Sequence, residues 1–209
     1  MDLPKSFRFA SISAALLAVT LVLPSAHAQQ AASRDPAAVK AGNYKIDPDH
    51  TQITFSLSHL GFSEFSGQFS GASGSLKIDP AKPEASQLKV TVSAASIQTT
   101  VPELTEKLKG KEWFDTAAYP QATFNASKIT PTGADTATIS GDLTLHGVTK
   151  PVTLTARLVG SGINPIDKAV TVGFQAKGTI KRGDFGIKQY LPVLGDDVQL
   201  LIDAAFVLE

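Results

Sequence analysis

The amino-acid sequence predicts an antiparallel all-β fold, and three features of the sequence point to that fold class. Apolar and polar residues alternate with a period of two in roughly nine segments, which is the pattern of half-buried strands. Turn-forming residues separate these segments, and only one short stretch has a helical period. The apolar residues of nearly every segment share one parity, as expected when all strands enclose one interior. A closed barrel is therefore favoured over a sandwich, which the alternation alone also fits.

The first segment, residues 1–28, has the features of a cleaved secretory signal peptide. Lys5 and Arg8 precede an apolar run from Phe9 to Leu23, and Ala26-His27-Ala28 forms a small-x-small cleavage site. The apolar run is too short for a comfortable transmembrane helix, so no stable membrane span is expected in the mature protein. We expect a periplasmic location in a Gram-negative cell, with secretion as the alternative.

Residues 29–43 are rich in Ala and Gln without a clear period, which predicts a flexible segment ahead of one domain at 44–209. The chain contains no cysteine, which excludes disulfides and thiol chemistry. Its 19 basic and 19 acidic side chains give a formal net charge of zero, with no basic stripe. Nucleic acid is therefore a poor candidate as a partner.

The first two predicted strands of the domain carry the phenylalanines that begin the apolar interior. Phe55 and Leu57 alternate with polar residues after an Asp-Pro turn. Phe65 and Phe69 follow on one parity, with glycines between and after them that predict bulges or sharp coiling. A further strand continues the alternation over 88–94.

A short helix is predicted over 102–110, PELTEKLKG, because a proline stands at its start, leucines lie four apart and a glycine ends it. Trp113 and Phe114 follow closely and are expected to lie over one end of the barrel as a lid. Phe124 then marks the next strand.

The stretch 141–158, GDLTLHGVTKPVTLTARL, is predicted to form a β-hairpin. Leu143 and Leu145 alternate with polar residues before HGVTKP, and Leu154 belongs to the same alternation after it. The pattern predicts a connection of about five residues, with Pro151 at the start of the second strand. Phe174 and Ile180 lie on the apolar parity of a later strand, and Phe185 in KRGDFGI is expected in a loop that borders the barrel mouth.

A barrel of about eight strands either fills itself with side chains or holds one slender ligand, and both readings fit the apolar parity. In the second case, the expected ligand-binding residues are Phe55, Leu57, Phe65, Phe69, Trp113, Phe114, Phe124, Leu143, Leu145, Leu154, Phe174, Ile180 and Phe185.

Catalysis and metal binding find little support in the sequence. His50, His59 and His146 lie far apart and lack metal-binding spacings, so no metal site and no catalytic residue are predicted. Two alternatives stay open. One is an enzyme that acts on a lipid-like substrate, using Asp184, Asp115 or a histidine at the barrel mouth as acid or base. The other is an adhesion or stress protein with a filled core.

Four segments together resemble the YceI family of exported lipid-binding proteins. They are YKIDPDHTQITFSLSHLGFSEFSGQFSGASGSLKIDP, KEWFDTAAYPQATFNASKI, GDLTLHGVTKPVTL and IKRGDFGI, within 44–209. The resemblance implies an extended lipocalin-like barrel whose interior holds the tail of a polyisoprenoid, an isoprenoid quinone or a fatty-acid derivative. It implies a binding protein for a small-molecule lipid rather than an enzyme, with no cofactor beyond a bound isoprenoid lipid or quinone, and leaves a homodimer open.

The sequence departs from the family pattern near the expected rim of the barrel. Lys107 stands where many members have a histidine, and Trp113 replaces the first phenylalanine of a Phe-Phe-Asp motif. Ser58 stands where a basic residue often precedes His-Leu-Gly. The head group of the ligand is therefore open at this stage, whereas the apolar interior matches the family.

Overall fold

The computed structural model describes residues 32–209, so the predicted signal peptide at 1–28 lies outside the described residues. The described chain forms ten strand segments and one α-helix, α1 at Pro102–Lys109, which is the predicted helix. The strands are β1 Gly42–Ile46, β2 Gln52–His59, β3 Ser63–Phe69, β4 Ala72–Ile78, β5 Gln87–Ser93, β6 Gln121–Pro131, β7 Thr136–Leu145, β8 Val148–Ile163, β9 Val170–Lys181 and β10 Asp197–Leu208. Short 3-10 helices are η1 Pro36–Ala38, η2 Pro48–His50, η3 Pro83–Ala85, η4 Ala94–Ser96 and η5 Arg182–Phe185.

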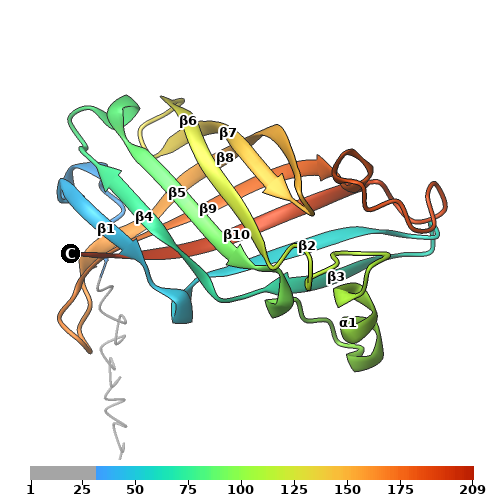
Figure 1. Ribbon diagram of the computed structural model, residues 1–209. Helices are drawn as coiled ribbons and strands as arrows, with labels where there is room; N and C mark the ends of the chain where they lie inside the picture. The colour runs from blue at the N-terminus through green and yellow to red at the C-terminus, as the bar shows by residue number, and fades with distance from the viewer. Residues whose placement is uncertain (1–31) are drawn as a thin grey trace, which may run out of the picture.

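The strands form one closed antiparallel barrel (Figure 1). On one side β10 pairs with β9; on the other it pairs with β2 over Gln199–Asp203 and with β1 over 206–208. β1 and β2 therefore occupy one position in the barrel wall, and β3 and β4 share the next. The ten segments fill eight positions, which confirms the predicted antiparallel barrel.

The two breaks in the wall follow from local sequence. Between β1 and β2, Pro48 begins η2, and the Asp47 carboxylate accepts a hydrogen bond from the backbone N–H of Asp49 at 3.1 Å. Between β3 and β4, Gly71 has a φ of +65°, a conformation that glycine adopts without steric cost. Each break bends its strand, so the wall can curve around on itself without losing the ladder to its neighbours.

The antiparallel order divides the connections between two ends of the barrel (Figure 1). We call one the helix end; it consists of the β2–β3 turn, the β5–β6 connection with α1, the β7–β8 turn and residues 182–196. We call the other the loop end; it consists of the β4–β5 connection, the β6–β7 turn and the β8–β9 turn. The C-terminus also lies at the loop end.

The predicted hairpin at 141–158 forms, but its connection is shorter than expected. β7 ends at Leu145 and β8 begins at Val148, so the turn is His146-Gly147, both with positive φ. Pro151 lies inside the ladder opposite Asp142 rather than at the strand start, which corrects the sequence-based boundary. Pro151 is tolerated there because β8 pairs with β9 only from Thr155 onwards. No residue of β9 therefore lies opposite Pro151 to accept the hydrogen bond that proline cannot donate.

The described part of the segment predicted to be flexible lies against the barrel. The backbones of Ser33 and Ser161 exchange two hydrogen bonds of 2.8 Å, and Val39 is buried in the core. β1 begins at Gly42, two residues before the predicted domain boundary. Flexibility of residues 29–43 in solution stays a prediction.

Candidate ligand-binding site

The barrel interior contains two cavities that lie end to end. Cavity 1, of about 320 Å³, extends to the loop end, and cavity 2, of about 170 Å³, lies at the helix end. Four residues line both cavities, and we call them the waist: Ile53, Phe124, Leu154 and Ile202. An interior of this kind is not the filled core that one of the sequence-based alternatives predicted.

Strand β10 shows how the alternating sequence builds this interior. Val198 and Leu200 line cavity 2, Ile202 belongs to the waist, and Ala204 and Phe206 line cavity 1. These five residues alternate along the strand, so one apolar parity forms the wall of both cavities. Eight residue steps of an extended strand cover roughly 26 Å, so the two cavities together form an elongated interior.

Cavity 2 is lined by α1 and the segment that follows it. Leu108 is buried on α1, Trp113 is 8% exposed, and both line the cavity with Phe114. The Phe114 ring meets Phe69 edge to face at 5.4 Å between centroids, and Phe69 lies 5.6 Å from Phe55. The surface that faces this cavity is entirely apolar. The predicted lid of Trp113 and Phe114 is therefore an inner wall of the helix end.

Arg182 also lines cavity 2, but its guanidinium group forms hydrogen bonds with the protein backbone. It is 4% exposed and donates hydrogen bonds of 2.8–3.1 Å to the carbonyl oxygens of Gly195, Ile187, Gln189 and Leu194. Burial lowers the pKa of Arg182, although the charge of Asp196 acts in the opposite direction. The side chain therefore stabilises the connection between β9 and β10 from inside.

Cavity 1 reaches the surface at the loop end. The β6–β7 turn contributes exposed lining residues at 133–135, and the β4–β5 connection contributes Pro80, Pro83 and Ser86. The ladder between β5 and β6 ends at the pair Lys89 and Asn125, and beyond it η3 packs against β6. This part of the wall is therefore closed by side-chain packing rather than by strand pairing.

The structure brings together most of the residues predicted to bind a ligand. Cavity 2 is lined by Phe55, Leu57, Phe69, Trp113, Phe114, Leu143, Leu145 and Ile180, cavity 1 by Phe174, and both by Phe124 and Leu154.

Phe65, expected on the apolar parity of its strand, and Phe185, expected in a loop at the barrel mouth, line neither cavity. Phe65 lies towards the tip of the β2–β3 hairpin, with its ring 6.3 Å from that of His59. Phe185 is 1% exposed and packs in the core of the helix end rather than bordering a mouth. Its carbonyl oxygen lies 3.0 Å from His146 Nδ1, which ties η5 to the β7–β8 turn.

Several lining residues were missed by the sequence-based prediction. Ile53 and Ile202 share the apolar parity of Phe55 and Phe206, so that parity contained the signal for them. Ala156 and Ala176 line cavity 1 without a distinctive signal, because alanine fits strands of any exposure. Ser86 follows η3 in a loop, and no periodicity predicts which loop residues reach an interior.

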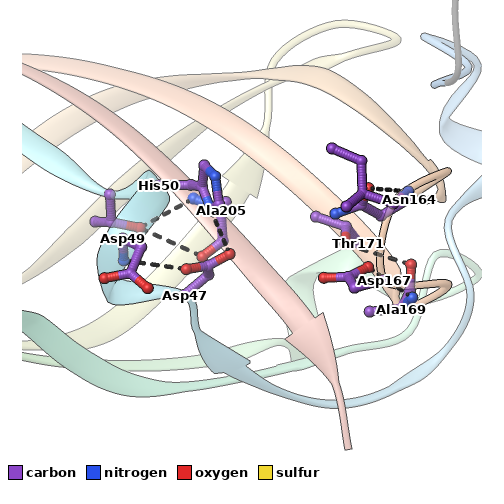
Figure 2. A network of polar contacts seen from close by, with 10 residues as sticks. Asp47, Asp49, His50, Asn164, Asp167, Ala169, Thr171 and Ala205 are labelled. Atoms are coloured by element: carbon purple, nitrogen blue, oxygen red, sulfur yellow. Dashed lines mark hydrogen bonds and ion pairs between the residues drawn. The ribbon is translucent and has the colours of Figure 1, made fainter.

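The cluster of titratable side chains around η2 lies in a turn and lines neither cavity. Figure 2 shows Asp47, Asp49 and His50 around η2 beside the β8–β9 turn. Asp47 Oδ2 lies 2.7 Å from His50 Nδ1, and the side-chain hydrogen bond to Asp47 raises the pKa of His50. Asp115, Asp184 and the histidines His50, His59 and His146 line neither cavity.

Within residues 32–209, no group of three or more His, Asp or Glu side chains is placed to hold a metal ion. The same described residues contain no helix with the length and apolarity needed to cross a bilayer.

Comparison with known proteins places this barrel among relatives of the same design. The model of the YceI-like domain matches residues 44–206. Protein YceI of Escherichia coli is 40% identical over 164 residues, which cover 78% of this chain and 85% of the relative. A UPF0312 protein of Azotobacter vinelandii is 38% identical over the same length.

Solved structures agree with the sequence relatives. The crystal structure of Burkholderia cenocepacia BcnA is similar with a TM-score of 0.69 and 26% identity, covering 77% of this chain and 98% of that one. The crystal structure of the YceI protein of Campylobacter jejuni is similar with a TM-score of 0.65 and 30% identity, covering 73% of this chain and 90% of that one. A structure described as a polyisoprenoid binding domain from Saccharophagus degradans shares the fold, with a TM-score of 0.61 at 17% identity and coverage of 81% and 100%. The family match over most of the barrel and the 40% identity show that this chain belongs to the YceI family.

Proposed function

We propose that the protein is a non-enzymatic binding protein that carries or stores a long-chain amphiphile, with the tail of the ligand inside the barrel. The observation that carries this proposal is the pair of apolar cavities joined at the waist, because a long and narrow apolar interior fits a single hydrocarbon chain. The description of the Saccharophagus neighbour as polyisoprenoid-binding supports an isoprenoid tail, and a quinone or fatty-acid derivative has a tail of similar shape. The N-terminal sequence supports a periplasmic site of action.

Burial of the tail supplies enough free energy for binding without a strong polar contact. A tail of about ten carbons at roughly 0.8 kcal/mol per CH₂ gives on the order of 8 kcal/mol before the cost of association. Longer tails that pass the waist and enter both cavities gain more. Selection among lipids therefore begins with the length of the tail.

The proposal is tested by extracting protein that was purified without detergent with organic solvent and identifying the released lipid by mass spectrometry. We expect one class of long-chain amphiphile in amounts comparable to the protein. Protein that is repeatedly recovered empty, and that also takes up neither added quinone nor added polyprenol, would refute the proposal.

A further inference from the structure

Polar groups are distributed unequally between the two ends of the interior. The surface facing cavity 2 is entirely apolar, so neither Trp113 nor Arg182 presents a polar atom to that space. Trp113 Nε1 is buried without a hydrogen-bond partner among the described residues, but it does not face the cavity. The guanidinium of Arg182 is held by four backbone carbonyls. The helix end therefore suits the apolar end of a ligand.

Cavity 1 contains the polar lining of the interior. The side chains of Thr51 and Thr136 line cavity 1 but already have partners, since Thr51 Oγ1 accepts from the Ala205 N–H at 3.1 Å and Thr136 Oγ1 accepts from Thr132 at 3.1 Å. Ser86 differs, because its hydroxyl is buried and has no hydrogen-bond partner within residues 32–209. An unpaired buried hydroxyl costs free energy, and a ligand oxygen or nitrogen beside it removes that cost.

The position of Ser86 fits a head-group contact. It directly follows η3, its backbone N–H is bonded to the Pro83 carbonyl, and its hydroxyl has no hydrogen-bond partner among residues 32–209. η3 closes the wall where the β5–β6 ladder has ended, and both Pro83 and Ser86 line cavity 1. A head group at this place would lie at the edge of the barrel while its tail runs inwards.

The charges near cavity 1 cancel and provide no net attraction for an anionic head group. Among the described residues that line this cavity, Arg157 is the only basic one and Asp135 the only acidic one. Two of the five N–H donors of the exposed Arg157 side chain are used, because Nε and Nη2 donate to Gln175 Oε1 at 3.3 and 3.1 Å. Phosphate groups are best recognised by several arginine or lysine side chains, and this lining supplies one arginine whose charge is offset by that of Asp135.

We propose that the ligand lies with a neutral hydrogen-bonding head group, such as an alcohol, amide or quinone, beside Ser86 at the loop end, and with the end of its tail beside Trp113. This assignment rests on the proposed function, and it adds the direction of the ligand and the class of its head group. A phosphate or pyrophosphate head is disfavoured at this site.

The direction is tested with the fluorescence of Trp113, which is the only tryptophan in the chain. Two hexadecanols are compared, one brominated at the end of the tail and one beside the hydroxymethyl group, because bromine quenches tryptophan only at close contact. We expect strong quenching by the first and little by the second. Displacement of a fluorescent fatty probe measures binding of each separately. Stronger quenching by bromine near the head would overturn the direction.

The head-group class is tested by competition between hexadecanol and hexadecyl phosphate, which share one tail. We expect the alcohol to bind about tenfold more tightly, which corresponds to one good hydrogen bond. Ser86→Ala should weaken alcohol binding about fivefold. Ser66→Ala is the matched control, because Ser66 is exposed on β3 and lines neither cavity.

The outcomes separate this inference from the proposed function. Tighter binding of the phosphate overturns the neutral head group, and an unchanged affinity of the Ser86→Ala variant overturns the contact. In both cases, saturable binding of one lipid molecule per protein would still support the proposed carrier function. Failure of every probe to bind a folded protein removes the proposed function and the inference together.

Discussion

Leu154 of β8 lies over Gly178 of the neighbouring strand β9, and the two fit only because Gly178 has no side chain. A Cβ atom at Gly178 would lie 2.5 Å from Leu154 Cδ2, well inside normal contact distance. Leu154 belongs to the waist between the two cavities. The glycine therefore leaves the space at the waist that the Leu154 side chain occupies.

We predict that Gly178→Ala displaces Leu154 and obstructs the waist. Overpacking should lower the free energy of unfolding by about 1–2 kcal/mol. Affinity should fall for lipids whose tails span both cavities and stay nearly constant for short ones, as measured by displacement titrations with a series of tail lengths. Gly173→Ala is the control, because a Cβ there would meet its neighbours at an ordinary 3.8 Å. An equal loss for all tail lengths would contradict the role of the waist.

Phe174 and Phe185 provide a comparison of the same residue type inside and outside the cavities. Phe174 lines cavity 1, whereas Phe185 is 1% exposed and lines neither cavity. Phe185→Ala should cost about 3–5 kcal/mol in urea unfolding, as a fully packed phenylalanine does. Phe174→Ala should cost clearly less, because its ring already borders empty space. A full-size loss for Phe174→Ala that added lipid does not change would indicate a solid core.

The hydrogen bonds of Arg182 predict that this side chain stabilises the helix end. Arg182→Met removes four charge-assisted hydrogen bonds and leaves carbonyl oxygens of 187–195 without donors, so we expect a loss of about 3 kcal/mol in unfolding free energy. Arg157→Met, whose exposed guanidinium bonds only the Gln175 side chain in the described chain, should change stability by less than about 0.5 kcal/mol. Similar small effects for both variants would show that Arg182 does not hold this connection.

The Asp47 and His50 pair predicts a dependence on pH. The hydrogen bond to Asp47 raises the pKa of His50 above 6.5. The stability that the charged His50 contributes is therefore fully present below pH 6.5 and is lost as pH rises through the raised pKa. For Asp47, burial acts to raise the pKa, but hydrogen bonds from His50 and the Asp49 backbone outweigh it and lower the pKa below 3.8. The Asp47 contribution is therefore present above 3.8 and is lost as pH falls through the lowered pKa.

The pair should accordingly stabilise the protein most between about pH 4 and pH 6.5. NMR titration of the His50 ring should give a pKa above 6.5 in the wild type and a lower one in Asp47→Asn. An identical His50 titration in both proteins would show that the two side chains are not paired in solution.

Much of the barrel was predictable because its signal is periodic. Every second residue from Val198 to Phe206 is apolar, so their common face follows from the period of a strand, and the same holds for Phe55 and Leu57. The turn at His146-Gly147 was placed too broadly, because Pro151 suggested that the second strand starts later than its observed first residue, Val148.

The candidate site was predictable only where it belongs to a strand interior. Phe65 has the same parity as Leu57 on the paired strand, but the hairpin extends beyond the cavity, and sequence period does not say where an enclosed space ends. Ser86 and Pro83 reach cavity 1 from a loop whose path depends on how η3 packs against β6. Such tertiary contacts have no local pattern in the sequence.

The most direct test of the account is to locate the lipid tail with isotope-filtered NMR on protein labelled at isoleucine and leucine methyl groups. With hexadecanol bound, we predict intermolecular NOEs from the chain methylene protons to the waist methyls of Ile53, Leu154 and Ile202, and none to Ile166, which is 90% exposed. Saturable binding with NOEs to Ile166 or other surface methyls and none to the waist would contradict the claim that the barrel interior holds the tail.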